Sequence, residues 1–495
     1  MNIKETKEEV KNTVKAYLKK DEYGEYMIPT YQQRPLLLIG PPGIGKTQIM
    51  EQIARECEIG LVSYTITHHT RQSAVGLPFI KEEVFNNQTY SITEYTMSEI
   101  IASVYQKMKA TGLQEGILFI DEINCVSETL APTMLQFLQC KTFGNQAIPQ
   151  GWIIVAAGNP AEYNKSVRDF DMVTLDRIRY IHVEADYRTW KEYALEKNIH
   201  RAILSYLELK PNHFYKVESD VDGMKFVTAR GWDDLSHLLQ MYEQLQIPIT
   251  KDIVQEFIHH EDVAEDFEAY YELFRKYEDD YGIYKILEGK VSSSVYARIL
   301  EASFDERISV VNLLLDGLNT FFSSYSKERE ITDKWYVFLK EYREVLNKSN
   351  NYKDSYLQLI HNYEQQFLNK KQEGILTKDQ IHLEEYLLKE WKEWDLKEGL
   401  ENSEAFQIIT LPFYKQKEKM EEVEKQVEIS LNHAFEFMEN AFTNGQEMVV
   451  FVTGLSMDSK SAFYLSEHDI PLYEKYKTEL LIGTRKAELL EDLQH

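Results

Sequence analysis

One short run constrains the fold of this chain more than any other. Gly40–Thr47 reads GPPGIGKT and fits the pattern G-x-x-x-x-G-K-[ST] at every fixed position. The strand-like run Leu36–Ile39 precedes it and the helix-like pattern Gln48–Cys57 follows it, a context that disfavours a glycine-proline turn carrying a lysine by chance. Glycines let a backbone wrap phosphate with its N–H groups turned inward, and the following helix adds the positive end of its dipole. We therefore expect Lys46 to neutralise the β and γ phosphates of ATP and the Thr47 hydroxyl to ligate Mg²⁺. The residues predicted to hold the nucleotide are Gly40, Pro41, Pro42, Gly43, Ile44, Gly45, Lys46, Thr47 and Gln48.

Two adjacent acids end a second strand-like run. Ile117–Ile120 is wholly apolar, and Asp121 and Glu122 follow it directly. Ligands of an open α/β sheet bind beyond the carboxyl ends of its strands, so both acids should lie near the phosphate loop. Asp121 is predicted to support Mg²⁺, and Glu122 to polarise the attacking water. An acidic helix cap is the alternative for an isolated Asp-Glu pair, and the phosphate loop argues against it.

Three further positions are candidates for contact with the γ-phosphate. Asn159 follows the apolar run Trp152–Ala157, where its amide would lie between the acids and the phosphate; an ordinary Asn-Pro turn is the alternative. Arg177 and Arg179 stand just before or within another strand-like run, and either is a candidate arginine finger for a neighbouring subunit's nucleotide. Arg230 opens a helix and is a candidate contact from the lid side. Surface salt bridges, or a surface position at a helix start, are the alternatives for the arginines.

The order of patterns predicts an α/β fold with a long helical extension. Residues 26–185 alternate apolar runs with amphipathic segments, which indicates an αβα sandwich around a parallel sheet. A short amphipathic helix is expected within 1–25, a helical lid over 186–280, and a helical domain of unknown role over 281–495. The runs expected to form strands are Leu36–Ile39, Ile117–Ile120, Trp152–Ala156 and Ile178–Val183.

Helical periodicity dominates the second half of the chain. In the lid, one helix is expected over Asp252–Tyr277. Thr377 and Gln380 have the spacing of a capping box before another helix, and the run Met448–Thr453 fits either a strand or a buried helical turn. Two apolar faces at helical spacing indicate a bundle or antiparallel hairpins: Trp335, Phe338, Leu339, Tyr342, Val345 and Leu346 in one, and Tyr356, Leu359, Ile360, Tyr363 and Phe367 in the other.

Composition narrows the class of protein. Of the 495 residues 43% are hydrophobic, which predicts a globular chain. The formal net charge of −26 opposes nucleic acid as the main partner, because it repels a phosphate backbone. Cys57, Cys125 and Cys140 lack metal-ligand spacing and are expected to be free, buried thiols. Without a signal-peptide core or an apolar run of membrane-spanning length, the protein is expected to be cytoplasmic, with no membrane contact.

Taken in order, these motifs resemble those of AAA+ ATPases, and most closely the MoxR-like group, which is related to dynein-type AAA modules. The resemblance covers roughly residues 26–280. It rests on Gly40–Thr47 (Walker A), Ile117–Asn124 (Walker B), Asn159-Pro160 (sensor 1), Leu175-Asp176-Arg177 (finger), Arg230 (sensor 2) and the segment Thr70-Arg71-Gln72 with Gly76-Leu77-Pro78. The approach to the finger, Asp169–Thr174, departs from the Leu-Pro-Glu-rich form usual in that group, which leaves Arg177 and Arg179 open as alternatives.

The resemblance implies a homo-oligomeric ring, often a hexamer, with nucleotide between subunits. It further implies chaperone-like remodelling of a protein partner or client, such as a protein with a von Willebrand factor A domain. Thr70–Glu94 and Thr142–Gln150 are expected as loops, either lining a pore or contacting a client, or as plain surface loops. Two other functions stay open: a nucleic-acid-directed motor, and a non-hydrolysing ATP switch that recruits a partner. The acidic charge opposes the first, and the presence of Glu122 opposes the second.

Overall fold

The computed structural model describes residues 1–68, 70–143, 146–163, 167, 170–220, 223–348, 351–394, 399–442 and 445–479. Asp169, two residues of the Thr142–Gln150 segment and the last residues of the predicted C-terminal domain lie outside this part of the chain. Two compact units are present. One comprises Met1–Thr189 with Asn362–Glu385, and the other comprises Trp190–His361 with the chain from Tyr386 onward.

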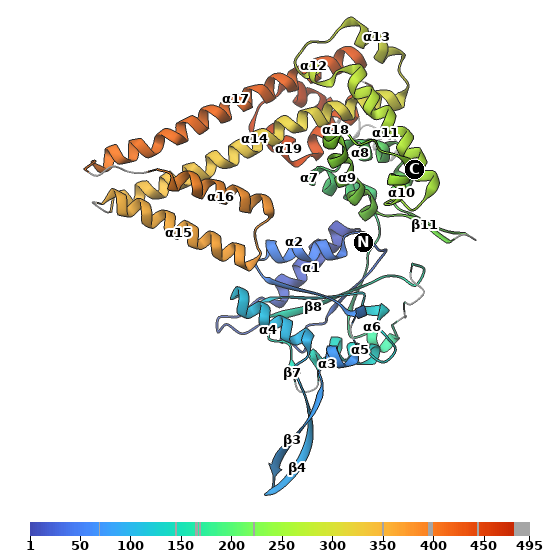
Figure 1. Ribbon diagram of the computed structural model, residues 1–495, viewed down its shortest axis with the longest axis vertical. Coiled ribbons are helices and arrows are strands. Elements are labelled where there is room, and N and C mark those ends of the chain that lie inside the picture. The colour runs from blue at the N-terminus through green and yellow to red at the C-terminus, as the bar shows by residue number, and fades with distance from the viewer. Residues whose placement is uncertain are drawn as a thin grey trace, which may run out of the picture. The chain divides into compact units, whose positions relative to one another are not determined.

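A five-stranded parallel sheet of order β2-β5-β8-β1-β9 forms the centre of the first unit (Figure 1). Its strands are β1 (Leu36–Ile39), β2 (Gly60–Thr65), β5 (Gly116–Asp121), β8 (Trp152–Gly158) and β9 (Arg179–His182). All residues of β1 and β8 are buried, as expected for central parallel strands covered on both faces. The predicted P-loop αβα fold is therefore confirmed. The strand β2 was not among the predicted runs, because its exposed Ser63 and Thr65 interrupt the apolar pattern.

Helices cover both faces of this sheet. In Figure 1, α1 and α2 lie on one face and α4 and α5 on the other. The second face holds a continuous apolar core in which Phe137 stacks on Phe143 with ring centroids 4.0 Å apart. The helices up to Leu175 are α1 (Ile3–Tyr17), α2 (Lys46–Glu56), α3 (Arg71–Val75), α4 (Glu99–Thr111), α5 (Ala131–Cys140) and α6 (Met172–Leu175), with the 3₁₀ turns η1 (Ile66–His68) and η2 (Ile123–Cys125).

The loop expected over Thr70–Glu94 was wrong, because most of this segment is a β-hairpin. Strands β3 (Pro78–Phe85) and β4 (Gln88–Tyr95) pair along their whole length and project from the sheet domain (Figure 1). Asn86 and Asn87 form the two-residue turn, both with positive φ (52° and 62°), the conformation that a type I′ turn requires. A shorter hairpin, β6 (Thr142–Phe143) with β7 (Gln146–Ala147), occurs in the other segment that was expected to be a loop.

Helices dominate the second unit, where the long α14 and α17 pack side by side. Trp391 stacks on Phe338 with ring centroids 4.2 Å apart, within the predicted apolar face of α14. The elements from residue 187 onward are α7 (Tyr187–Glu196), α8 (Arg201–Leu209), η3 (Pro211–His213), β10 (Lys216–Asp220), β11 (Gly223–Val227), α9 (Ala229–Leu245), α10 (Lys251–Gln255), α11 (Glu261–Tyr281), α12 (Ile283–Leu287), α13 (Ser293–Glu301), α14 (Phe304–Leu346), α15 (Tyr352–Glu373), α16 (Lys378–Lys392), α17 (Asn402–Phe442), α18 (Gln446–Met457) and α19 (Ser459–Glu467).

Several predictions for these helices are settled by the structure. Thr377 and Gln380 exchange the two hydrogen bonds of a capping box, at 2.9 and 3.3 Å. The undecided run Met448–Thr453 is helical, within α18. The single helix over Asp252–Tyr277 was wrong, because the chain breaks between α10 and α11. There the carbonyl of His259 accepts the backbone N–H of Phe226 at the end of the β10–β11 hairpin, which draws this stretch out of helical geometry.

The cysteine prediction is half right. All three thiols are free, but Cys57 and Cys125 are only half-buried and Cys140 is exposed. Cys140 is the last residue of α5 and lies on the solvent-facing side of this helix, away from its buried apolar face. Within the described part of the chain, no helix combines the length and the apolar run that a membrane span needs.

Candidate functional site

The phosphate-loop pattern forms the turn between β1 and α2. Gly45 is the residue before α2 and has φ of +94°, a conformation that side chains other than glycine rarely adopt. Lys46 opens the helix and is 8% exposed. Its ammonium group turns back into the loop and donates to the carbonyls of Gly40 and Pro41, each at 2.7 Å. The loop thus folds around the ammonium group of Lys46. Gln48 follows in the first turn of the helix and is exposed.

The first acid of the pair lies beside the loop hydroxyl. Asp121 is the last residue of β5, and its Oδ2 accepts a hydrogen bond of 3.1 Å from Thr47 Oγ1. These residues are far apart in the chain, and the parallel register of β5, β8 and β1 brings them to one edge of the sheet. A hydroxyl and a carboxylate oxygen at this distance are the hard oxygen donors that Mg²⁺ prefers.

The second acid has an unusual backbone. Glu122 has φ of +58° and ψ of +34°, a left-handed conformation that costs a side-chain-bearing residue about 1 kcal/mol or more. Its Oε2 accepts a 2.9 Å hydrogen bond from Thr67 Oγ1, which follows β2. The sequence analysis did not find Thr67, because nothing local to that residue marks it.

Asn159 connects the loop to the neighbouring strand. Its Oδ1 accepts from Lys46 Nζ at 3.0 Å. Its own backbone is held by the buried Asn124, which donates Nδ2 to the Asn159 carbonyl at 2.7 Å and accepts the Asn159 N–H at 3.3 Å. Gly158 leaves the room for this contact, since a Cβ there would lie 2.4 Å from Asn124 Oδ1. The sequence analysis quoted Asn124 within the Walker B resemblance but assigned it no role.

The two arginines at the start of β9 have different surroundings. Arg177 is exposed and donates Nη1 to Gln139 Oε1 of α5 at 2.5 Å. Arg179 instead points to α1 of the same chain, where it donates Nη1 to Thr13 Oγ1 at 2.7 Å and forms an ion pair with Glu9. Both arginines thus have partners within their own chain, a neutral amide for Arg177 and a charged carboxylate for Arg179.

Arg230 belongs to the second compact unit, not to the one that holds the phosphate loop. It is exposed in the first turn of α9, and Thr228 caps this helix by accepting the Gly231 N–H at 3.1 Å. The structure thus gathers Lys46, Thr47, Asp121 and Asn159, with Glu122 adjacent, and leaves Arg230 on a different body.

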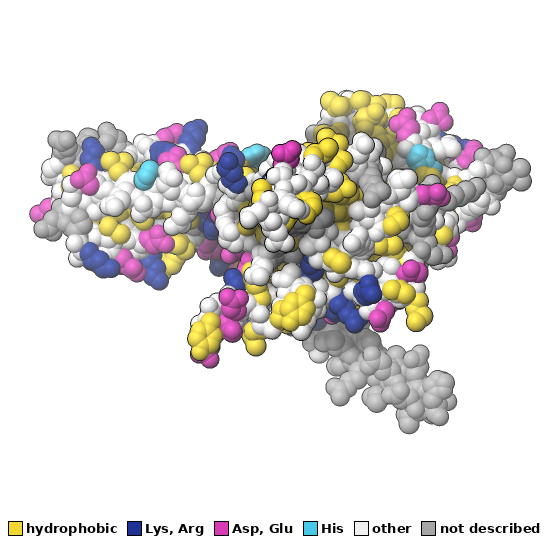
Figure 2. Space-filling model, turned by 90° about the horizontal axis from the view of Figure 1, so that it is seen from below, with side chains coloured by type: hydrophobic (Ala, Val, Ile, Leu, Met, Phe, Trp, Pro, Cys, Tyr) yellow, Lys and Arg dark blue, Asp and Glu magenta, His cyan; other side chains and the backbone are white. Residues whose placement is uncertain are grey.

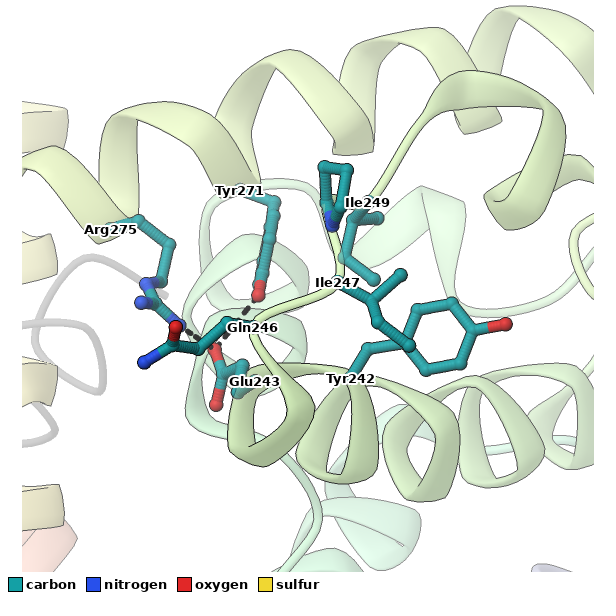
Figure 3. A pocket seen from close by; sticks show the side chains of 8 residues that line it. Tyr242, Glu243, Gln246, Ile247, Ile249, Tyr271 and Arg275 are labelled. Carbon is teal, nitrogen blue, oxygen red and sulfur yellow. Dashed lines mark hydrogen bonds and ion pairs between the residues drawn. The ribbon is translucent and has the colours of Figure 1, made fainter.

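A cavity of about 400 Å³ lies in the second unit between α9 and α11 (Figure 3). None of the predicted site residues lines it. Its polar side centres on Glu243, which accepts from Tyr271 at 2.8 Å, from Arg275 at 2.7 Å and from His200 at 3.1 Å. Burial alone would raise the pKa of Glu243, but the hydrogen bonds and charges of His200, Arg275 and Tyr271 outweigh it and lower the pKa to about 2. Its neighbours thus hold Glu243 in the charged form.

Replacing Glu243 by glutamine should therefore destabilise the second unit in a pH-dependent way. A carboxyl whose pKa falls on folding stabilises the protein above its unfolded pKa of about 4.3, and this contribution is lost as the pH drops towards 2. Glu243→Gln should lower the free energy of unfolding by about 2 kcal/mol at pH 7 and by clearly less at pH 3. Urea unfolding at both values measures this, with Glu272→Gln, at an exposed position of α11, as the control. An equal loss at both pH values would contradict the explanation.

Comparison with known proteins adds one match. Residues 36–174 fit the model of the family described as "ATPase family associated with various cellular activities (AAA)". No curated protein matches the chain. The matched segment runs from β1 to α6 and contains the loop, both acids and Asn159, whereas the three arginines lie beyond its end. This part of the chain is therefore an AAA domain, which implies ATP binding and an ATP-driven activity.

Proposed function

We propose that this protein hydrolyses ATP with Mg²⁺ and uses the cycle to remodel a protein partner. The observation that supports the chemistry best is the convergence of Lys46, Thr47, Asp121 and Asn159 at the carboxyl edge of β1, β5 and β8. The lysine already holds its ammonium group among loop oxygens, where the β and γ phosphates would compete for it. Asn159 would then be released from the ammonium group to orient the attacking water.

The donor set also fits a magnesium ion. Thr47 and Asp121 offer a hydroxyl and a carboxylate oxygen that now bond to each other at 3.1 Å. Mg²⁺ usually takes only one or two protein oxygens and completes its shell with water and phosphate. When bound, the ion would neutralise charge on the phosphate oxygens. Thr47 would supply a direct ligand, and Asp121 would hold the ion or its waters.

Glu122 is the proposed general base. Glu122 follows directly after β5, at the carboxyl edge of the sheet, where its carboxylate would accept the proton of the attacking water. Thr67 donates a hydrogen bond to the same carboxylate. A chain that only bound ATP as a switch would not need this group, so its presence supports hydrolysis over the switch alternative.

We assign the arginine finger to Arg177. It is exposed and donates to the neutral amide of Gln139 on α5, whereas Arg179 is half-buried and forms an ion pair with Glu9 of α1. An exposed guanidinium at the domain surface can reach the γ-phosphate of a neighbouring subunit, as a ring would require. Arg230, on the helical unit, would sense the same phosphate within the subunit and link its state to lid closure.

The remodelling part of the proposal is supported by the β3–β4 hairpin. The hairpin carries exposed apolar side chains, among them Phe79, Ile80, Val84 and Phe85, with exposures of 43%, 77%, 66% and 50%. Figure 2 looks from below Figure 1 towards the end from which the hairpin projects, and shows hydrophobic side chains among acidic and basic ones. Exposed apolar groups gathered on one projecting element are typical of a surface that contacts another protein. By the MoxR-like resemblance, a protein with a von Willebrand factor A domain is the proposed partner.

Phosphate release tests the proposal. It should require Mg²⁺, and activity per subunit should rise with protein concentration and then level off, because Arg177 completes the site of a neighbour. The full chain is assayed over a wide concentration range, with EDTA as the metal-free control and with permanently unfolded α-lactalbumin added as a model client. Flat activity at every concentration would oppose the shared site. Absence of turnover with and without the added protein would oppose hydrolysis and favour the switch.

A further inference from the structure

The helix α1 contacts two parts of the AAA domain that are distant in sequence. On one side, Lys7 and Lys11 both form ion pairs with Glu56 at the end of α2, the first at 2.6 Å. On another side, Glu9 and Thr13 hold Arg179 at the start of β9. The helix that starts at Lys46 and the strand that follows Arg177 are therefore joined through one element.

This connecting element is well fixed. A capping box closes its start, with Asn2 and Glu5 each accepting the other's backbone N–H. Val10 and Val14 are fully buried (0% and 1% exposed), and burial of their apolar side chains holds the helix against the domain. A helix anchored in this way moves as one body, so a shift of α2 is passed to the residues that hold Arg179.

Only a short, ordered stretch separates Arg179 from Arg177. Ile178 between them is 3% exposed and packs in the sheet core. Before them, Asp171 caps α6 by accepting the Thr174 N–H at 2.7 Å, and Arg177 N donates to the Thr174 carbonyl at 3.0 Å. The start of β9 is also fixed by the bond from Arg179 N to the Pro35 carbonyl at 2.8 Å. The position of the Arg177 backbone is thus set by where Arg179 is held.

We infer that Glu9 and Thr13, acting through Arg179, are positioning residues for the Arg177 finger, so that α1 links the nucleotide site of each subunit to the finger that it presents to its neighbour. This inference rests on the proposed function. In this inference Arg179 does not contact a nucleotide. It is the residue through which α1 holds the start of β9, next to Arg177. Its ion pair keeps the side chain half-buried, with 37% exposed.

Mixed rings give the sharpest test. A subunit with Glu9→Gln should keep its own ATP site and present a misplaced finger, whereas a subunit with Glu122→Gln should lack turnover and present an intact finger. Each variant alone should turn over ATP more slowly than the wild type. For Glu9→Gln the decrease should be about tenfold to 10²-fold, the range that a displacement near 1 Å produces. Mixing the two should restore turnover above the sum of the separate rates, because Glu9→Gln sites then receive a sound finger.

Three measurements separate the outcomes. Asn12→Ala, at an exposed position of the same helix, is the control and should behave like the wild type. ATP affinity of Glu9→Gln should stay within about twofold of the wild type, since the variant leaves the phosphate loop intact. The exchange Glu9→Arg with Arg179→Glu should recover part of the lost turnover.

Normal turnover by Glu9→Gln would overturn the inference, and so would a loss that mixing does not relieve, because the defect would then lie in the subunit's own site. Failure of the proposed function looks different. In that case the wild type releases no phosphate, or Arg177→Ala is as active as the wild type, irrespective of any change at Glu9.

Discussion

Glu122→Gln is expected to lower ATP turnover by at least about 10²-fold and to leave ATP affinity within about twofold. Glutamine keeps the size of the side chain and can still accept the Thr67 hydroxyl, so the local geometry should persist. What it loses is the ability to take a proton from water as the bond to the γ-phosphate forms. Because Lys46 and Thr47 are untouched, binding should remain.

Steady-state phosphate release and equilibrium binding of fluorescent ATP measure the two halves of this prediction. Glu128→Gln is a suitable control, because Glu128 is exposed a few residues farther along the same loop. Turnover at the wild-type rate would remove Glu122 as the base. Loss of binding together with turnover would instead show that the left-handed turn at Glu122, directly after Asp121, had been disturbed.

Local patterns were sufficient to predict the elements that carry the site. The loop Gly40–Thr47, the strand before it and the helix after it follow from apolar runs, glycine and a lysine within about a dozen residues. The strand that ends at Asp121 and the strand that precedes Asn159 were predicted for the same reason, since each contains a continuous buried apolar run. A parallel sheet then brings its carboxyl ends together, so the meeting of these side chains needed no further information.

The contacts that the sequence did not reveal join residues distant in the chain. Three pairs show this: Thr67 and Glu122 are 55 positions apart, Asn124 and Asn159 are 35 apart, and Glu9 and Arg179 are 170 apart. Each is an ordinary polar residue whose partner is decided by strand order and helix placement, which periodicity does not specify. The choice between Arg177 and Arg179 was open for this reason, and the contact of Arg179 with α1 now favours Arg177.

The missed hairpin has a different cause. The signal was present as Asn86-Asn87 between runs rich in β-branched and aromatic residues, a pattern that predicts a two-residue turn. Its strands read as a loop because neither face is buried and so neither shows apolar alternation. A hairpin that projects into solvent lacks the burial pattern on which strand prediction depends.

Lys46→Met should abolish ATP binding, with affinity at least about 10²-fold weaker, and should cost the fold little. The ammonium group donates to the carbonyls of Gly40 and Pro41 and to Asn159 Oδ1. With nucleotide it would exchange these neutral acceptors for phosphate oxygens, so that the donor and the acceptor would both carry charge. Methionine has nearly the same length and no charge, so the buried stem stays packed while the phosphate loses its counter-charge.

The two effects can be measured separately. Binding of fluorescent ATP should vanish over the concentrations that saturate the wild type, whereas thermal unfolding without nucleotide should shift by only a few degrees, as expected for about 1 kcal/mol. Lys109→Met, at an exposed position in the last turn of α4, is the matched control and should bind normally. Unchanged ATP affinity of Lys46→Met would mean that Lys46 does not hold the phosphates of the bound nucleotide. A collapse of the fold without nucleotide would mean instead that the lysine is mainly structural, because its bonds to the loop carbonyls would then be what holds β1 and α2 in place.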